Sequence, residues 1–312
     1  YLKFEANENY YKGEPSIKNV VFQIIENADT AILALQNGEV DAYQMTPQQV
    51  KKLDLDASNL STYSYSEGRV GYLEINCNRV TDEKVRKALL YAMDRKAMDD
   101  AAFESSEYYS IPYTFLPTNS QFYTEDGVEK YEQDVDKAKS MLEDAGVSGL
   151  KLKLGYMSSD AVQSAQALLI QEQLKEVGVT VELAGGDGTA IANAMKDPDN
   201  EYDMYLGGYI MGIDPDTFSS LFENDGAYNY MHYSGYDTID QLFEEGRSEL
   251  DESARKETYA KLQAAVQDTG AFYPIISNNK ILVVNNRIQG VEDAGLVPVY
   301  TFEDTSSLKI AE

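Results

Sequence analysis

Apolar and polar residues alternate in two short segments that lie on either side of a helical pattern. Residues 150–156 place Leu or Tyr at every second position, and residues 179–183 repeat the alternation with Val and Leu, so both are predicted to be β-strands. Between them, apolar residues recur every three or four positions from Ala167 to Val177, which predicts a helix that ends at Gly178. This order predicts a parallel pair of strands with a right-handed crossover.

A similar unit begins at Tyr72. Leu73 and Ile75 belong to a strand-like run, and residues 76–81 contain turn-forming residues. Thr81 is the predicted N-cap of a following helix, with acidic residues near the positive end of its dipole. That helix carries a run of apolar residues at helical spacing, namely Val85, Ala88, Leu89, Ala92 and Met93.

The remaining elements follow from the same two periodicities and from Gly, Pro and Asn punctuation. Helices are predicted over residues 30–37, 134–145, 217–222 and 251–268, and strands over residues 1–5, 20–25, 40–42, 203–206, 275–276 and 281–284. Strands and helices mixed along the whole chain predict an α/β fold. The change of pattern near Arg69–Gly71 predicts a boundary between two lobes.

Composition narrows the function classes. The chain has 312 residues and a formal net charge of −27, with acidic residues spread along it, so its surface would repel nucleic acid and anionic lipid. Cys77 and His232 are the only cysteine and histidine. One cysteine cannot form an intramolecular disulfide, and one cysteine with one histidine cannot form a Cys/His zinc cluster. A Ser-His-Asp or Cys-His catalytic site could take its histidine and cysteine only from these two residues. We therefore expect no cofactor and no metal.

Two segments contain candidate binding residues. Gly207 and Gly208 follow a predicted strand and would let another backbone approach closely, although Asp214 or Asp216 in the same loop would equally suit a plain helix cap. Tyr72 and Glu74 are two positions apart on a strand and so share a face. A glutamate there needs a partner or a wet cleft, unless the strand is an edge strand that faces solvent.

Four separated segments also carry letter patterns that occur together, in this order, in one family. They are NENYYKGEPSIKNVVFQIIENADTAILALQNGEVD at 7–41, GYLEINCNRVTDEKVRKALLYAMDRKAM at 71–98, DVDKAKSMLEDAG at 134–146 and DMYLGGYIMGIDPDTFSSLF at 203–222. The chain thus resembles the extracellular solute-binding proteins of family 5, the oligopeptide- and dipeptide-binding type of bacterial ABC importers.

The resemblance implies a periplasmic-binding-protein-like α/β fold of type II. Residues 1–70 would be an incomplete part of the N-terminal lobe, residues 71–285 the C-terminal lobe, and residues 286–312 a segment that returns toward the first lobe. The chain is then the C-terminal portion of a longer protein. That protein would be extracellular or periplasmic, anchored by a lipid, monomeric, and partnered with the membrane permease of the importer. It would close two lobes over a peptide and catalyse no reaction.

The resemblance also implies the site. The family's ligand loop maps to Gly207, Gly208, Tyr209, Met211 and Asp214, and the family strand that borders the cleft maps to Tyr72 and Glu74. Tyr230 falls in a matching "NY-x-x-YS" stretch, whereas His232 beside it is expected to be exposed or satisfied within the core.

The chain departs from the family at two of these positions. Met211 stands where peptide binders often carry an acid that pairs with the ligand's α-amino group, and Gly208 stands where they carry tryptophan. Because methionine supplies no countercharge, a free amine would gain little here unless Asp214 or Glu74 substitutes. Two alternatives stay open: the same fold binding a non-peptide solute such as an oligosaccharide or a nickel chelate, and an extracellular hydrolase that uses carboxylates.

Overall fold

The computed structural model describes residues 1–103, 106–210, 214–298 and 300–311. The chain forms two compact units, one from residues 1–67 together with residues 279 onward, and one from residues 68–278. We describe each unit by itself. The lobe boundaries at residues 70 and 285 that the sequence predicts stay a prediction.

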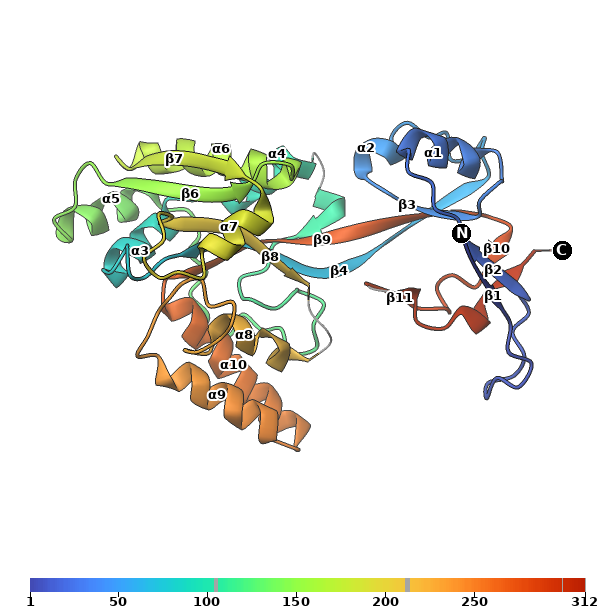
Figure 1. Cartoon of the computed structure of the whole chain (residues 1–312). Helices are drawn as coiled ribbons and strands as arrows, with labels where there is room; N and C mark the ends of the chain where they lie inside the picture. The colour runs from blue at the N-terminus through green and yellow to red at the C-terminus, as the bar shows by residue number, and fades with distance from the viewer. Residues whose placement is uncertain (104–105, 211–213, 299, 312) are drawn as a thin grey trace. The chain divides into compact units, whose positions relative to one another are not determined.

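The larger unit is built on a mixed sheet (Figure 1). Its strands lie in the order β9 (Phe272–Asn285), β4 (Leu60–Ile75), β8 (Met204–Ile210), β6 (Lys151–Met157) and β7 (Thr180–Gly186). The short strand β5 (Tyr109–Ser110) pairs with β9. Strand β8 runs antiparallel to β4, and β6 runs parallel to both β7 and β8. The α/β fold and the parallel pairing of the two alternating segments are therefore confirmed.

Helices cover both faces of this sheet (Figure 1). One face carries α3 (Glu83–Tyr91), α4 (Arg95–Phe103), α5 (Val135–Asp144) and α6 (Ala161–Glu176). The other carries α7 (Gly188–Ala194), the 3-10 helix η2 (Pro215–Phe218), α8 (Ser219–Phe222), α9 (Asp237–Ser248) and α10 (Glu252–Asp268). Several helices begin at an aspartate whose side chain accepts a hydrogen bond from a backbone amide of the first turn. These aspartates include Asp134, Asp160, Asp187 and Asp251.

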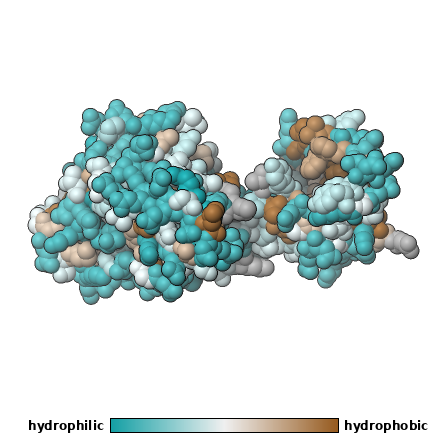
Figure 2. Space-filling model, turned by 90° about the horizontal axis from the view of Figure 1, so that it is seen from below, coloured by the Kyte–Doolittle hydropathy of each residue, from teal (hydrophilic) through white to brown (hydrophobic). Residues whose placement is uncertain are grey.

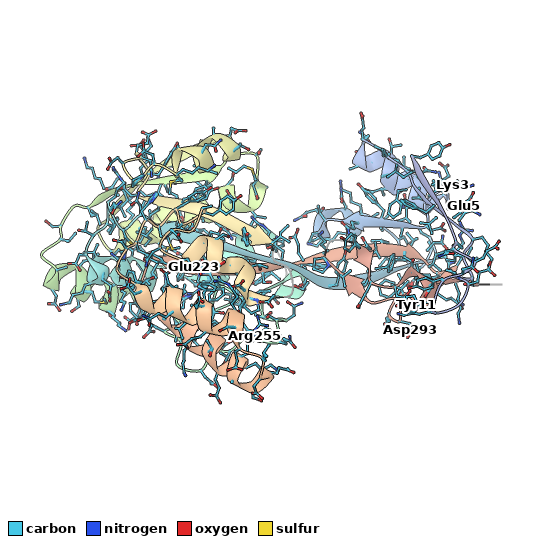
Figure 3. The ribbon with its side chains drawn as sticks, turned by 60° about the horizontal axis from the view of Figure 1, so that its bottom comes forward. Lys3, Glu5, Tyr11, Glu223, Arg255 and Asp293 are labelled. Carbon is cyan, nitrogen blue, oxygen red and sulfur yellow. The ribbon has the colours of Figure 1, made fainter. Side chains whose placement is uncertain are left out.

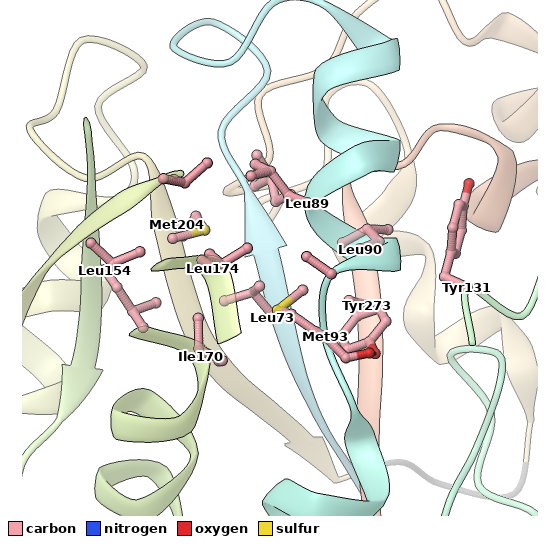
Figure 4. Packing of buried hydrophobic residues seen from close by; sticks show 14 of the residues in the cluster. Leu73, Leu89, Leu90, Met93, Tyr131, Leu154, Ile170, Leu174, Met204 and Tyr273 are labelled. Carbon is pink, nitrogen blue, oxygen red and sulfur yellow. The ribbon is translucent and has the colours of Figure 1, made fainter. Parts of the chain in front are cut away.

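Each sheet face has its own core. Leu73, Leu154 and Met204 from three neighbouring strands pack against Leu89 and Ile170 from α3 and α6 (Figure 4). On the opposite face the core is aromatic and consists largely of Tyr72, Phe115, Phe218, Phe222 and Phe272. The sequence expectation that Leu73 and Ile75 face a core is confirmed, since both are fully buried.

The smaller unit is less regular. It contains the hairpin of β1 (Leu2–Glu5) and β2 (Asn19–Phe22), helices α1 (Ala28–Gln36) and α2 (Pro47–Val50), and strand β3 (Ala42–Met45), which pairs with β9. The 3-10 helix η1 (Ser106–Tyr108) belongs to the larger unit. The smaller unit also contains the short strand pairs β10 (Ile288–Gln289) with β13 (Lys309–Ile310) and β11 (Leu296–Val297) with β12 (Thr301–Phe302), and the 3-10 helix η3 (Thr305–Ser307). Its core is a small cluster around Tyr65, Leu282 and Val284.

Three sequence expectations need correction. Asp82, not Thr81, caps α3, because its carboxylate accepts the amide of Lys84 at 2.8 Å. The predicted strands at 275–276 and 281–284 are one strand, β9, and the run at 72–75 is only the end of the 16-residue β4. The polar middle of β9 and the polar first part of β4 were not predicted from the sequence. A strand whose residues are only partly buried shows no clear alternation of apolar and polar residues.

Candidate ligand-binding site

The antiparallel pairing of β4 with β8 places Tyr72, Glu74, Gly207 and Tyr209 on one sheet face. Tyr72 lies opposite Gly207, and Glu74 lies opposite Tyr205. Because side chains alternate along a strand and paired residues share a face, Tyr72, Glu74 and Tyr209 point to the same side of the sheet. Gly208 belongs to the opposite face. Pairing across the sheet thus joins two segments more than 130 residues apart in the sequence.

The two glycines are closely flanked by side chains. A Cβ atom at Gly207 would lie 2.5 Å from Cε2 of Tyr72, whose ring is held against Phe272 at a centroid distance of 4.6 Å. A Cβ atom at Gly208 would lie 2.0 Å from the guanidinium of Arg69. The Arg69 head group ends a flexible chain and can move, whereas the Tyr72 ring is buried. Only glycine therefore fits at Gly207 without a shift in the core.

The far half of β8 is an open strand edge. Its parallel register with β6 ends at the pair Gly155–Tyr205, while its antiparallel register with β4 continues to Ile210. Within the described chain, residues 206–210 of β8 therefore have a strand on one side only. Gly208 and Ile210 are exposed there, and Tyr209 is half-buried. Met211 lies outside the described residues.

Tyrosine rings extend from this edge along the sheet. Tyr209 contacts Tyr228 at a centroid distance of 6.5 Å, Tyr228 contacts Tyr230 at 6.2 Å, and Tyr230 contacts Tyr205 at 6.0 Å. Sequence reasoning named Tyr209 and Tyr230 but missed Tyr205 and Tyr228. The alternation Tyr205-Gly207-Tyr209 was a signal for Tyr205, because residues two apart on a strand share a face.

Glu74 lies at the base of this tyrosine row and is fully buried. Neither of its carboxylate oxygens has a hydrogen-bond partner among the described residues. Burial raises the pKa of Glu74 well above its usual range. Because β4 lies between β9 and β8, the alternative of a solvent-facing edge strand is wrong for this residue.

Asp214 is engaged within the unit. Its Oδ1 accepts the amide of Asp216 at 2.9 Å and caps η2, as the plain-cap alternative expected. Both of its oxygens also lie 2.8 Å from Nη2 of Arg255 on α10. Figure 3 shows Arg255 and Glu223 among the helices on this side of the sheet. A ligand contact at Asp214 would have to compete with these two partners.

The single histidine and the single cysteine both make contacts within the protein. Nε2 of His232 lies 2.7 Å from the carbonyl oxygen of Met195, so the expectation of a histidine satisfied within the protein is confirmed. Cys77 lies just after β4, where its amide bonds the carbonyl of Met231, and burial raises the pKa of its thiol to about 11. Such a thiol is a poor nucleophile at neutral pH.

The described residues provide neither a metal-ion site nor a membrane-spanning helix. No group of three side chains among His, Cys, Asp and Glu is placed to hold a metal ion. Of the helices that the structure describes, none combines the length and the apolar character needed to cross a bilayer. Outside scattered apolar patches, the visible surface is hydrophilic (Figure 2).

Known proteins with similar sequence and structure place this geometry in a family. The model for bacterial extracellular solute-binding proteins, family 5 (middle region), matches residues 1–230. The oligopeptide-binding protein AppA of Bacillus subtilis is 26% identical over 92% of this chain and 55% of its own length. The nickel-binding periplasmic protein of Escherichia coli is 23% identical over 99% of this chain and 62% of its own length.

A solved structure agrees closely. The ABC transporter substrate-binding protein CtaP of Listeria monocytogenes is 37% identical, covers 99% of this chain, and superposes with a TM-score of 0.92. This chain spans 64% of that structure and 55% of AppA of B. subtilis. From the family match over residues 1–230 and this structural agreement, the chain belongs to the bacterial extracellular solute-binding proteins of family 5.

Proposed function

We propose that this chain is the ligand-capturing part of a substrate-binding protein of a bacterial ABC importer, and that it holds a peptide in extended form along β8. The observation that carries the proposal is the open edge of β8 over residues 206–210, where the glycine pair leaves the backbone uncovered by side chains of its own. An exposed strand edge binds an extended peptide through main-chain hydrogen bonds.

The site residues have distinct roles in this proposal. Gly207 makes room for the Tyr72 ring, exposed Gly208 lets the peptide backbone approach, and Tyr209 lines the edge with an amphipathic ring. Tyr72 and Glu74 form the floor beneath the tyrosine row, and Tyr230 covers it. Asp214 caps η2 and is itself held by Arg255. At Met211 a free α-amino group gains no countercharge.

The whole protein acts outside the cytoplasmic membrane. It is lipid-anchored, works as a monomer, and delivers its ligand to the permease after two lobes close around it, without catalysing a reaction. A nickel chelate is the alternative ligand, since one relative is a nickel-binding protein. The described residues favour a peptide, because an open strand edge matches a peptide backbone.

Calorimetry with the present chain tests the proposal. A set of short peptides should bind, and the same peptides with N-methylated backbone amides should bind more weakly, because methylation removes the donors that an open strand edge needs. Gly208→Val should weaken binding about tenfold or more, since a branched side chain crowds the space that Gly208 leaves for an approaching backbone. The fold should survive this substitution, because only the mobile Arg69 head group has to move.

The matched control is Leu250→Ser, which changes another exposed position that is distant in sequence from β8. This variant should bind as the wild type does. Equal binding of methylated and unmethylated peptides, or no effect of Gly208→Val, would show that β8 is not the binding edge.

A further inference from the structure

Glu74 carries a buried carboxyl group that lacks a hydrogen-bond partner among the described residues. It lies in the interior of the sheet, its side chain has no exposed surface, and both of its oxygens lack a hydrogen-bond partner among the described residues. Burying a polar group without a partner costs free energy, so native proteins keep such groups rarely and often for function. This orphaned carboxyl group is therefore unlike the capping and ion-paired carboxylates elsewhere in the chain.

The tyrosines around Glu74 also have unused hydrogen-bonding capacity. Tyr72, Tyr205 and Tyr230 make no hydrogen bond through their hydroxyl groups to any other residue that the structure describes. Buried tyrosines normally find a partner. In the same unit, the hydroxyls of Tyr131 and Tyr273 donate to backbone carbonyls at 2.9 and 3.1 Å. These hydroxyls thus gather around Glu74, whose carboxyl group also lacks a hydrogen-bond partner among the described residues.

We propose that Glu74 and the three surrounding tyrosines form a recognition site for a cationic group of the ligand, either an ammonium or a guanidinium. The carboxylate supplies the countercharge, the phenol oxygens accept N–H donors, and the ring faces attract the cation. This inference rests on the proposed function, because it assumes that a ligand lies against this sheet face. It names one chemical feature of that ligand.

Glu74 holds its proton more tightly than an exposed glutamate does. Burial raises the pKa of Glu74 well above its usual range, and the phenols of Tyr72, Tyr205, Tyr230 and Tyr233 lie close enough for a charge on Glu74 to act on them. Burial, with the Glu74 charge as a further cause, raises the pKa of each of these phenols too, and that of Tyr205 reaches about 12. An arriving cation stabilises the ionised carboxylate, so Glu74 releases its proton to solvent as the cation binds.

Access runs past Tyr205 and Tyr230. The side chain of Tyr205 lies directly across from Glu74 and is only half-buried. Its ring meets that of Tyr230 edge to face, at an interplanar angle of 77°. Tyr230 lies on the connection between α8 and α9 rather than on the sheet, so its ring can shift without disturbing a strand pair. The cation enters where these two rings meet.

A direct test follows the carboxyl carbon of Glu74 by ¹³C NMR in the present chain, with Glu74→Gln to identify the signal. The titration midpoint is measured with methylguanidinium chloride and with methylurea, which has nearly the same shape but no charge. Methylguanidinium should lower the midpoint by about one pH unit or more, and methylurea should leave it unchanged. An unchanged midpoint with both probes overturns the proposal, and so does an equal shift with both.

A second test compares two peptides that differ only in lysine or norleucine at one central position, scanned along the peptide. The wild type should prefer the lysine form at one position by about tenfold to a hundredfold, and Glu74→Gln should abolish the preference. Glutamine has nearly the same shape as glutamate and carries no charge to bury, so the variant should fold. Glu245→Gln, at an exposed carboxylate on α9, should keep the preference.

The two tests separate the two proposals. If no peptide binds, the proposed function fails, and the NMR titration still decides whether Glu74 receives a cation. If peptides bind but lysine and norleucine forms bind equally at every position, the cation site is refuted while the peptide-binding function stands.

Discussion

Asp99 shows at the scale of one residue how this fold treats a buried charge. Its side chain on α4 is buried. Oδ1 lies 3.4 Å from the side-chain Nε2 of Gln166, and Oδ2 has no hydrogen-bond partner among the described residues. Arg95 lies one turn earlier but donates to the carbonyls of Pro274 and Tyr131 instead of to Asp99. Burial therefore dominates and raises the pKa of Asp99 to about 8.

This pKa makes stability depend on pH. Between about pH 4 and pH 8 the unfolded chain loses the Asp99 proton while the folded chain keeps it, so the free energy of unfolding falls as pH rises through this window. Asp99→Asn removes the effect. The free energy of unfolding of this variant, relative to that of wild type, should rise with pH by about 1 kcal/mol per pH unit over most of the window. Urea denaturation from pH 5 to pH 8 measures this difference.

The neighbouring Asp100 is the matched control. A hydrogen bond from Lys96 lowers the pKa of Asp100, so its contribution changes only in more acidic solution. Asp100→Asn should therefore differ from wild type by a constant amount between pH 5 and pH 8. Parallel pH profiles for Asp99→Asn and wild type would contradict the assignment of a raised pKa to Asp99.

At the scale of elements, the register of β4 and β8 decides which glycine is structural and which is available to a ligand. Gly207 and Gly208 are adjacent in sequence, but alternation along the strand turns them to opposite faces. Gly207 lies under the buried ring of Tyr72, and Gly208 lies under the flexible head group of Arg69. The sequence presents the two glycines as an equivalent pair, and the pairing of strands makes them different.

Alanine substitutions should reveal this difference. Gly207→Ala forces a methyl group against a ring that Phe272 holds in place, and should lower the free energy of unfolding by about 1–3 kcal/mol. Gly208→Ala needs only a movement of Arg69 and should cost less than about 0.5 kcal/mol. Chemical denaturation of both variants measures the difference; equal losses would mean that the register between β4 and β8 is wrong.

At the scale of the molecule, the two units differ in how much of their structure is covered. The hairpin of β1 and β2 pairs only with itself among the described strands, and Leu2, Phe4, Val21 and Phe22 on it are exposed. The strands of the larger unit lie between two layers of helices. A two-stranded hairpin without a covered face is marginally stable in water.

Hydrogen exchange should therefore distinguish the units. Amides in the β1–β2 hairpin should be protected at least roughly a hundredfold less than the central amides of the β4–β8 pair, because local opening of the hairpin exposes little buried surface. The measurement is repeated at two protein concentrations, since exposed apolar strands can recruit another chain. Strong, concentration-independent protection across residues 1–42 would contradict the expectation.

Local sequence patterns determined helices α1, α3, α5, α6 and α10, the parallel β6–β7 pair, the α/β class and the family resemblance. These features depend on residues close together in the chain: a capping aspartate and its first turn, or an alternation over seven residues. Tertiary structure alone decided that Glu74 is buried, that β4 extends back to Leu60, and that Tyr205 stands opposite Glu74. Periodicity shows which residues share a face, but a strand's neighbours and the layer that covers it are set by contacts between distant segments. For the same reason, the orphaned carboxyl group of Glu74 becomes visible only once β4, β8 and the tyrosine row are brought together.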